Sequence, residues 1–259
     1  HAVLAVTFTN KAAGEMKERV GKLTNLDTRR LWVSTFHSAA VRMLRMDRDD
    51  IGRPRDFAIY DDGDSENLIK TILRELKIDP KEHKPSWFAS IIGRAKDELQ
   101  SPDAWLEKSP LPRVQSEEIH AVYARYQEGL RRANALDFGD LLVEAVELLE
   151  NPETLARYHD RFSHFLVDEF QDTNVAQYRM VRALSSRTRN LCVVGDDDQS
   201  IYEWRGADRR NIVMFEETYP DAGVVVLEEN YRSTQPILTA ASNLIAHNVR
   251  IREKKLFTN

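Results

Sequence analysis

Two adjacent carboxylates, Asp168 and Glu169, follow directly on the short apolar run 165–167. This run is too short for a helix and is typical of a buried strand in a parallel sheet. Open α/β sheets bind their ligands beyond the carboxyl ends of the strands. One carboxylate in that place can hold a hydrated magnesium ion, and the other can orient or deprotonate a water molecule. A strand that simply ends in acidic residues explains the pair equally well, so the pair needs support from elsewhere in the chain.

Polar clusters follow the other predicted strands in the same way. These strands are predicted at residues 2–8, 31–35, 191–194 and 223–227. The carboxyl ends of parallel strands lie at one edge of the sheet, so we expect the clusters to converge there. A glutamine at that edge can sense the γ-phosphate of a nucleotide, and an arginine can stabilise charge on it in the transition state. Each cluster alone is weak support for such a site, and their ordered recurrence in one chain is strong support.

Aromatic side chains are interleaved with these polar residues at Phe8, Phe36, Tyr202 and Trp204. Planar rings beside basic groups suit stacking on the bases of a nucleic-acid single strand, which contributes ~1–3 kcal/mol per base. Phe8 and Phe36 could instead be core residues at strand ends, and their spacing alone favours that reading. Tyr202 and Trp204 belong to residues 200–206, whose composition is typical of a loop and not of a core element.

Other candidate residues also have structural explanations. A single histidine such as His37 is more often a structural residue than a ligand, and Tyr231 and Arg232 could form an ordinary surface pair.

The elements that must position these residues alternate along the chain. Strand and helix patterns succeed each other up to residue 48 and again from residue 137, which predicts an α/β fold with a parallel sheet and helices on both faces. Residues 49–136 instead contain three amphipathic helical patterns and no convincing strand, with prolines punctuating them. We therefore expect an all-helical insertion within the α/β domain.

Composition restricts the class of protein. The chain has 259 residues, of which 42% are hydrophobic and 31% charged, and its formal net charge is −5. The net charge does not predict nucleic-acid binding, so such binding requires local basic and aromatic patches. Cys192 lies in an apolar run, which predicts a buried structural thiol, and the histidines show no metal-ligand spacing. No apolar run approaches a membrane span and no signal-peptide pattern opens the chain, so we expect a cytoplasmic protein with no membrane partner.

Five segments together resemble the successive motifs of the UvrD/Rep/PcrA family of superfamily-one DNA helicases. The segments are AVTFTNKAA (5–13), STFHS (34–38), VDEFQDT (167–173), VVGDDDQSIYEWRGAD (193–208) and LEENYRST (227–234). Their order is the family's order, and the helical insertion falls between the second and third of them. The resemblance spans essentially the whole chain and implies a RecA-like fold of the P-loop NTPase type, with ATP and Mg²⁺ as cofactors.

The resemblance also implies a role for each matching residue of the nucleotide site. Asp168 would coordinate magnesium, and Glu169 would activate the hydrolytic water. Gln199 would couple the γ-phosphate to the DNA site. Tyr231 would stack on the adenine, and Arg232 would contact the γ-phosphate from a second motor domain.

Single-stranded DNA would lie along a separate track. The residues that match this track are Phe8, Thr9, Asn10, His37, Phe138, Tyr202, Trp204 and Arg205. Phe138 belongs to the block LDFGDLL (136–142), in which the family usually has Asp where Gly139 stands.

The resemblance predicts four segments with distinct places in a two-domain motor. Residues 1–48 and 137–224 would form the first RecA-like domain, 49–136 its helical insertion, and 225–259 the start of a second RecA-like domain. The chain contains no G-x-x-x-x-G-K-[ST] phosphate loop, which these helicases require. We therefore interpret the chain as an internal piece of a longer protein and expect the isolated piece to be inactive.

The whole protein would be an ATP-dependent 3′-to-5′ DNA helicase that acts on single strands and on single/double-strand junctions, in DNA repair or replication and with accessory proteins. Two alternatives stay open at this point: the helicase subunit of a recombination nuclease, and a non-catalytic module that binds single-stranded DNA.

Overall fold

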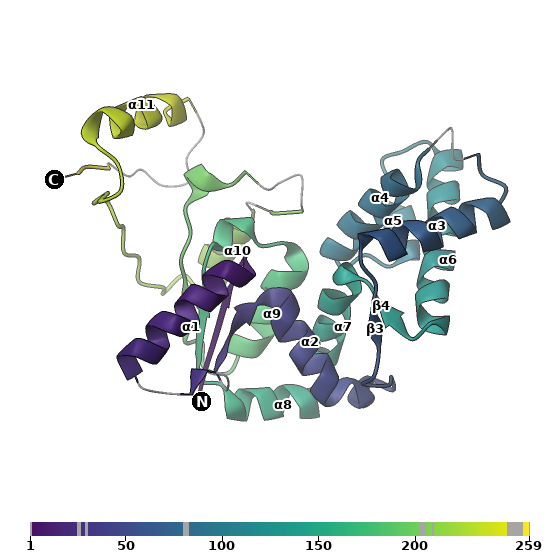
Figure 1. The fold of residues 1–259 in the computed structure, drawn as a ribbon, viewed down its shortest axis with the longest axis horizontal. Helices are drawn as coiled ribbons and strands as arrows, with labels where there is room; N and C mark the ends of the chain where they lie inside the picture. Colours follow the sequence, from purple (N-terminus) through teal and green to yellow (C-terminus); the bar gives the residue numbers. More distant parts are fainter. Residues whose placement is uncertain are drawn as a thin grey trace.

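A four-stranded parallel sheet forms the centre of the larger of two cores (Figure 1). The computed structural model describes residues 2–24, 27–28, 31–79, 83–201, 206–208, 210–247 and 256–258. The strands, in their order across the sheet, are β2 (Trp32–Thr35), β1 (Val3–Thr7), β5 (His164–Val167) and β6 (Leu191–Val193). Every pairing is parallel, with Val6 opposite Ser34 on one side and Val167 on the other. The predicted α/β class and parallel sheet are therefore confirmed.

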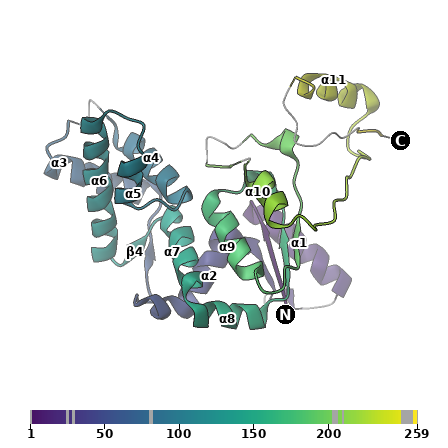
Figure 2. The same cartoon turned by 180° about the vertical axis from the view of Figure 1, so that it is seen from behind.

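Helices cover both faces of this sheet, although unequally. Leu4, Val6, Phe165 and Val167 point to one face and share a core with three helices, α2 (Phe36–Asp47), α7 (Phe138–Glu150) and α9 (Val175–Ser185). Helix α1 (Asn10–Thr24) packs on β1 and β2 from the opposite side, as the two views of Figures 1 and 2 show. Two further helices, α8 (Pro152–Arg161) and α10 (Arg210–Thr218), complete this part of the fold.

The prediction that Cys192 is a buried structural thiol was wrong, because its side chain is exposed. In the register of β5 and β6, Cys192 pairs with Leu166, which is itself exposed. Both side chains belong to the face that α1 covers only over β1 and β2, and no described element covers them there. An apolar run therefore identified the strand correctly but did not reveal that one of its faces lies open.

The insertion has a separate core made by four helices: α3 (Asp62–Glu75), α4 (Pro85–Asp97), α5 (Pro102–Lys108) and α6 (Arg113–Arg132). Its central side chains include Ile69, Phe88 and Ile119, none of which is exposed to solvent. The expectation of a segment without strands was wrong at its base. There β3 (Ala58–Ile59) pairs in parallel with β4 (Ala135–Leu136), so the two ends of the insertion lie side by side.

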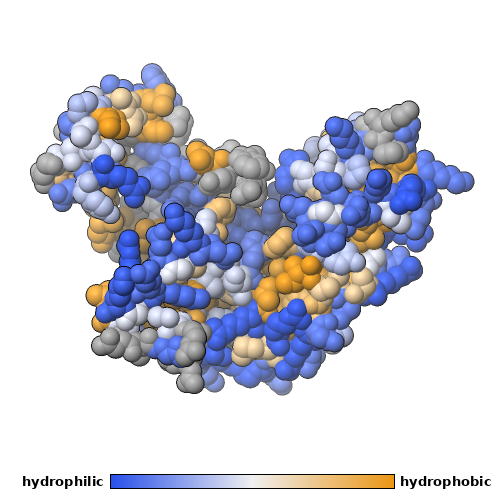
Figure 3. All heavy atoms as spheres, viewed as in Figure 1, coloured by the Kyte–Doolittle hydropathy of each residue, from blue (hydrophilic) through white to orange (hydrophobic). Residues whose placement is uncertain are grey.

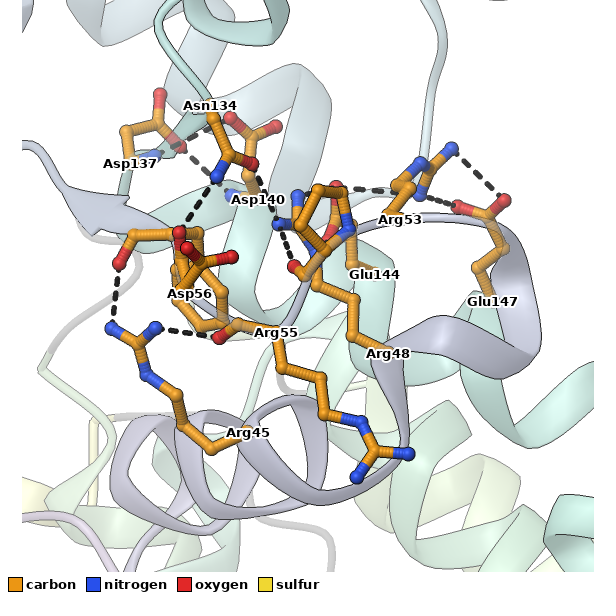
Figure 4. A network of polar contacts seen from close by, with 12 residues as sticks. Arg45, Arg48, Arg53, Arg55, Asp56, Asn134, Asp137, Asp140, Glu144 and Glu147 are labelled. Carbon is orange, nitrogen blue, oxygen red and sulfur yellow. Dashed lines mark hydrogen bonds and ion pairs between the residues drawn. The ribbon is translucent and has the colours of Figure 1, made fainter.

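An ion-pair network fastens the base of the insertion to α7 (Figure 4). We call Arg48, Arg53, Glu144 and Glu147 the arginine junction. Arg48 is buried and binds both carboxylate oxygens of Glu144, with Nε at 2.7 Å and Nη2 at 3.1 Å. Arg53 binds Glu147 in the same two-pronged way at 2.6 and 3.0 Å. Arg48 precedes β3 in the chain and Glu144 follows β4. The junction therefore holds together the two segments through which the chain enters and leaves the insertion.

The last part of the chain departs from the prediction of a strand at residues 223–227. These residues form no regular element, and their side chains, including Val225 and Leu227, are exposed. A strand needs a partner for its backbone groups, and the described contacts of this region run instead from Glu229 and Asn230 to Phe257. Helix α11 (Gln235–Ile245) follows. Within the part of the chain that the structure describes, no helix combines the length and apolar character needed to cross a membrane.

Candidate functional site

A cavity of about 520 Å³ opens where α2, α7 and β3 meet the ends of β1 and β2. Figure 3 shows a largely apolar patch over the region of α2 and α7. Five of the eight residues predicted to contact DNA line this one cavity, although they come from three distant parts of the sequence. The five are Phe8, Thr9, Asn10, His37 and Phe138.

Three helix N-termini bring these residues together. Thr9 Oγ1 accepts a hydrogen bond from the Ala12 amide at 3.1 Å and so caps α1 directly after β1. Thr35 ends β2 and caps α2 in the same way, accepting from the Ser38 amide at 3.2 Å. Asp137 caps α7, which makes Phe138 the first residue of that helix. Phe8, Thr9 and Asn10 directly follow β1, and His37 and Phe138 lie in the first turns of α2 and α7, so all five line the cavity.

His37 and Phe138 form the aromatic part of the cavity. Their rings meet edge to face, with centroids 5.8 Å apart, and the Phe138 side chain is 48% exposed. Burial lowers the pKa of His37, so its imidazole is neutral at pH 7. A neutral ring beside an exposed phenyl ring suits contact with the faces of bases more than a charge interaction with phosphate.

Residues that the sequence did not single out also line the cavity. They are Thr35, Ser38, Val41, Ile59 and Leu141. Ile59 belongs to β3, the short strand that the sequence did not reveal, so nothing in the sequence predicted its place. The Phe36 side chain is a core residue and not a ring that stacks on bases, because it is buried and absent from the cavity lining.

Asp168 and Glu169 lie beyond the end of β5, as predicted. The Thr7 hydroxyl, at the end of the neighbouring strand β1, donates to Asp168 Oδ2 at 3.2 Å. Glu169 has a φ of 54°, in the left-handed region that non-glycine residues seldom occupy. This conformation turns the chain between β5 and the 3-10 helix η3 (Phe170–Asp172), and it leaves the Glu169 side chain exposed.

Gln171, which the sequence reading did not single out, connects Glu169 to the end of β6. Its Nε2 donates to Glu169 Oε2 at 2.8 Å, and its Oε1 accepts from the Asp196 amide at 3.0 Å. Gln199 Nε2 in turn donates to Asp196 Oδ2 at 2.7 Å. A β-carbon at Gly195 would lie 2.8 Å from Gln171 Oε1, so a larger residue there would displace the Gln171 side chain. The structure therefore links Glu169 with Gln199 through two intermediate residues.

Other predicted residues are not joined to this edge. Tyr231 is 91% exposed, and Arg232 is also exposed on the segment before α11. The described hydrogen bonds of that segment hold its own turn, with the Arg232 amide donating to Asn230 Oδ1 at 3.0 Å. Three predicted DNA contacts, Tyr202, Trp204 and Arg205, lie outside the described residues.

The metal prediction rests on Asp168. Among the described residues, no three His, Cys, Asp or Glu side chains gather closely enough to hold a metal ion by themselves. Magnesium in nucleotide sites commonly takes one or two carboxylates together with substrate phosphates and water. The Asp168 carboxylate, positioned by the buried Thr7 hydroxyl, offers the hard oxygen ligand that this ion prefers, so it fits magnesium bound with a nucleotide.

Comparison with known proteins agrees with this geometry. The UvrD/REP helicase N-terminal domain matches residues 1–220. The chain is 49% identical over 258 residues to the ATP-dependent DNA helicase PcrA of Staphylococcus aureus strain Mu50, and 48% identical to that of Staphylococcus epidermidis strain RP62A. Each alignment covers 99% of this chain and 35% of the relative, so the chain spans about a third of these helicases. The match over residues 1–220 places this chain in the UvrD/REP helicase family.

Proposed function

We propose that the protein to which this chain belongs is an ATP-dependent DNA helicase. It moves along single-stranded DNA in the 3′-to-5′ direction and unwinds the duplex ahead of it. The single observation that carries this proposal is the cavity that unites Phe8, Thr9, Asn10, His37 and Phe138 from three chain segments. The similar proteins described above are ATP-dependent DNA helicases, which agrees with this proposal.

In the DNA cavity, aromatic rings contact the bases and polar groups contact the sugar-phosphate backbone. His37 and Phe138 stack on bases, and the exposed Phe138 ring makes the larger contact. Thr9 and Asn10, at the exposed start of α1, donate hydrogen bonds to the sugar-phosphate backbone. Tyr202, Trp204 and Arg205 extend this track. Contact through rings and amides explains how a chain with a net charge of −5 binds a polyanion.

On the nucleotide side, the residues beyond β5 and β6 act together. Asp168 holds Mg²⁺, which neutralises charge on the phosphates when it is bound with ATP. Glu169 accepts a proton from the attacking water, and Gln171 keeps its carboxylate in place. Gln199 reports the γ-phosphate to the DNA track, while Tyr231 stacks on the adenine. Arg232 approaches from a second motor domain, so ATP binding closes the two domains and hydrolysis reopens them.

The proposed function also includes the place of action and the form of the DNA. The protein acts in the cytoplasm on single strands and on single/double-strand junctions, in repair or replication and with accessory proteins. The 259-residue chain by itself contains no phosphate-loop sequence, so on its own it does not turn over ATP. Residues 225–259 form the start of the second motor domain.

The proposal is tested with the full-length protein and two variants. Glu169→Gln removes the base, and we expect DNA-stimulated ATP turnover to fall by a factor of about 100 or more while DNA still binds. Phe138→Ala removes one stacking ring, and we expect affinity for single-stranded DNA to fall about tenfold. Val114→Ala, an exposed apolar residue on α6, serves as the matched control and should change neither quantity.

Duplexes with either a 3′ or a 5′ single-stranded tail test the polarity, and only the 3′-tailed substrate should be unwound. DNA binding without DNA-stimulated ATP turnover in the full-length native protein would instead identify a non-catalytic DNA-binding module.

A further inference from the structure

The last two residues of α4 each hold the N-cap of a different helix in the motor core. Lys96 Nζ binds Asp137 Oδ2 at 2.6 Å, and Asp137 is the N-cap of α7. Asp97 Oδ1 accepts from Asn174 Nδ2 at 2.5 Å, and Asn174 is the N-cap of α9. Two consecutive residues of one insertion helix therefore bind the N-caps of two different helices.

These two helix starts belong to the two halves of the proposed site. Helix α7 begins with Phe138, which lines the DNA cavity. Helix α9 begins directly after residues 168–173, the segment that carries the proposed metal ligand and base. The end of α4 thus touches the support of the DNA side through Lys96 and the support of the nucleotide side through Asp97.

A third segment, which returns from the predicted DNA loop, also meets Asp97. Gly206 has a φ of +85°, and a β-carbon there would collide with the Asp97 carboxylate, lying 3.0 Å from its Cγ. Just beyond it, the Asp208 amide donates to the Thr173 carbonyl at 3.0 Å, and Asn211 Nδ2 donates to the same oxygen at 2.8 Å. The segment after Tyr202–Arg205 is therefore fastened to the residue next to Asn174 and packed against Asp97.

Lys96 is fully committed to its own partners. Its ammonium is buried, lies 2.6 Å from Asp137 and 2.8 Å from Asp140, and faces the Tyr126 ring. Gly139 makes room for its stem, because a β-carbon there would lie 2.8 Å from Lys96 Cδ. We call Lys96, Asp97, Asp137, Asp140 and Asn174 the lysine junction.

Burial, together with neighbouring carboxylates, disfavours the ionised form of Asp97. Burial is the largest cause that raises the pKa of Asp97 to about 7, and the carboxylates of Asp137 and Glu98 add to it. The hydrogen bond from Asn174 works in the opposite direction. Its contacts with Asn174 and Gly206 hold Asp97 in these surroundings.

We propose that Asp97 is a positioning residue that couples DNA in the cavity beside Phe138 to the ATP-hydrolysing segment 168–173. The coupling rests on the proposed helicase function. DNA that presses on Phe138 displaces the start of α7, and Lys96 passes this to the end of α4. Asp97 then shifts the start of α9 and the loop segment at Gly206 together, which sets the side chains of residues 168–173 for hydrolysis. Allosteric coupling of this kind has typical magnitudes of about 5- to 150-fold.

The test uses the full-length protein with Asp97→Ala and Asp97→Asn. Three quantities are measured: ATP turnover without DNA, ATP turnover with saturating oligo(dT), and the affinity for oligo(dT). For Asp97→Ala we expect the first and third to stay within about twofold of native and the second to fall about tenfold. Asp97→Asn keeps an oxygen that accepts from Asn174, so it should restore stimulated turnover to within about threefold of native.

Glu107→Ala is the matched control, since Glu107 is an exposed carboxylate on α5 of the same insertion and should leave all three quantities unchanged. A double-mutant cycle with Asn174→Ala separates the specific contact from a general loss of folding. The double variant should be no worse than the poorer single variant, and strictly additive losses would contradict the coupling.

The outcomes also separate the two proposals. Native full-length protein whose ATP turnover does not respond to DNA would overturn the helicase function and the coupling with it. Native stimulation that survives Asp97→Ala, or a loss that equals the loss of DNA affinity, would overturn the coupling alone.

Discussion

Two of the contacts that join the insertion to the motor core bind α7 through a buried cation. At the arginine junction, the planar guanidinium of Arg48 uses separate N–H groups for Glu144, the Pro54 carbonyl and Asn134. At the lysine junction, one ammonium serves both Asp137 and Asp140. An arginine fork fixes geometry, whereas a lysine is a point charge that two carboxylates can share. We therefore expect the arginine junction to attach the base of the insertion rigidly and the lysine junction to form an adjustable attachment beside the site.

The pKa values of Asp137 and Asp140, the two carboxyl groups that bind Lys96, reflect this shared charge. Burial raises the pKa of Asp140, whereas at Asp137 the Lys96 ammonium outweighs burial and holds the pKa below its usual range. Asp140 is therefore the group that takes up a proton first if the ammonium moves. At the arginine junction, in contrast, two cations face one carboxylate, because Glu144 pairs with Arg48 at 2.7 Å and with Arg53 at 3.3 Å.

Breaking the arginine junction should have the largest effect. Arg48→Met leaves Glu144 with only its longer pair to Arg53 Nη1, at 3.3 Å, and the Pro54 carbonyl without its donor, so we expect a loss of about 3 kcal/mol in the free energy of unfolding. Urea unfolding of the native and variant chains measures it. Arg55→Met is the control, because its pair with Asp49 is exposed and should contribute less than about 1 kcal/mol. Equal losses in both variants would contradict the difference in burial.

Breaking the lysine junction should have a smaller and pH-dependent effect. Lys96→Met raises the pKa of Asp137 and Asp140 in the folded state, because two carboxylates then face each other without a cation. The folded variant binds protons that the unfolded chain releases, so its stability falls as the pH rises. We expect a loss of about 2–3 kcal/mol at pH 8 and a smaller loss at pH 5, from urea unfolding at both values. A loss that does not change with pH would show that the pair does not share a charge.

Asp97 should give the lysine junction a second pH dependence. Its folded-state pKa of about 7 exceeds the ordinary value of 3.8, so the proton it keeps stabilises the folded chain fully below about pH 4. That stability is lost as the pH rises through about 7. Asp97→Asn removes this dependence and should make the chain more stable than native at pH 8, by on the order of 1 kcal/mol. Unfolding curves from pH 4 to 8 measure it, and parallel native and variant profiles would contradict it.

The smallest effects should come from two helical glycines, one of which faces the Lys96 side chain while the other faces open space. Gly139→Ala places a β-carbon against the stem of Lys96, and we expect a loss of about 1 kcal/mol. Gly93→Ala lies inside α4 with nothing within 4 Å, and the better helix propensity of alanine should stabilise the chain by about 0.5–1 kcal/mol. Thermal unfolding compares the two, and effects of the same sign would show that the Lys96 stem adapts freely.

The sequence predicted the parts of the molecule that follow from strand and helix boundaries. Phe8 and His37 were expected to converge because each follows a strand, Phe138 was assigned by the family resemblance, and the cavity brings the three together. Asp168 and Glu169 lie beyond β5 for the same reason. Such predictions succeed because parallel strands place all their carboxyl ends at one edge, whatever the sequence between them.

The remaining features depend on partners that are distant in the chain. Lys96 reads as a surface lysine, and only the fold brings it to Asp137, 41 residues away. Gln171 carries no signal beyond its place in VDEFQDT, since its partner Asp196 lies on another strand end. Cys192 and residues 223–227 were predicted from apolar content, which indicates a strand but not whether anything covers or pairs with it.

The pairing of β3 with β4 also bears on the order of folding. The central pair β1 and β5 joins residues far apart in the chain, as with Thr7 and Asp168, which are separated by 161 positions. Closing so long a loop is entropically slow, whereas the contacts within a helical bundle are local and form early. Once Ala58 meets Ala135, the collapsed insertion shortens the path that the central sheet must close. The insertion would then hasten the assembly of the motor core, in addition to anything it does on DNA.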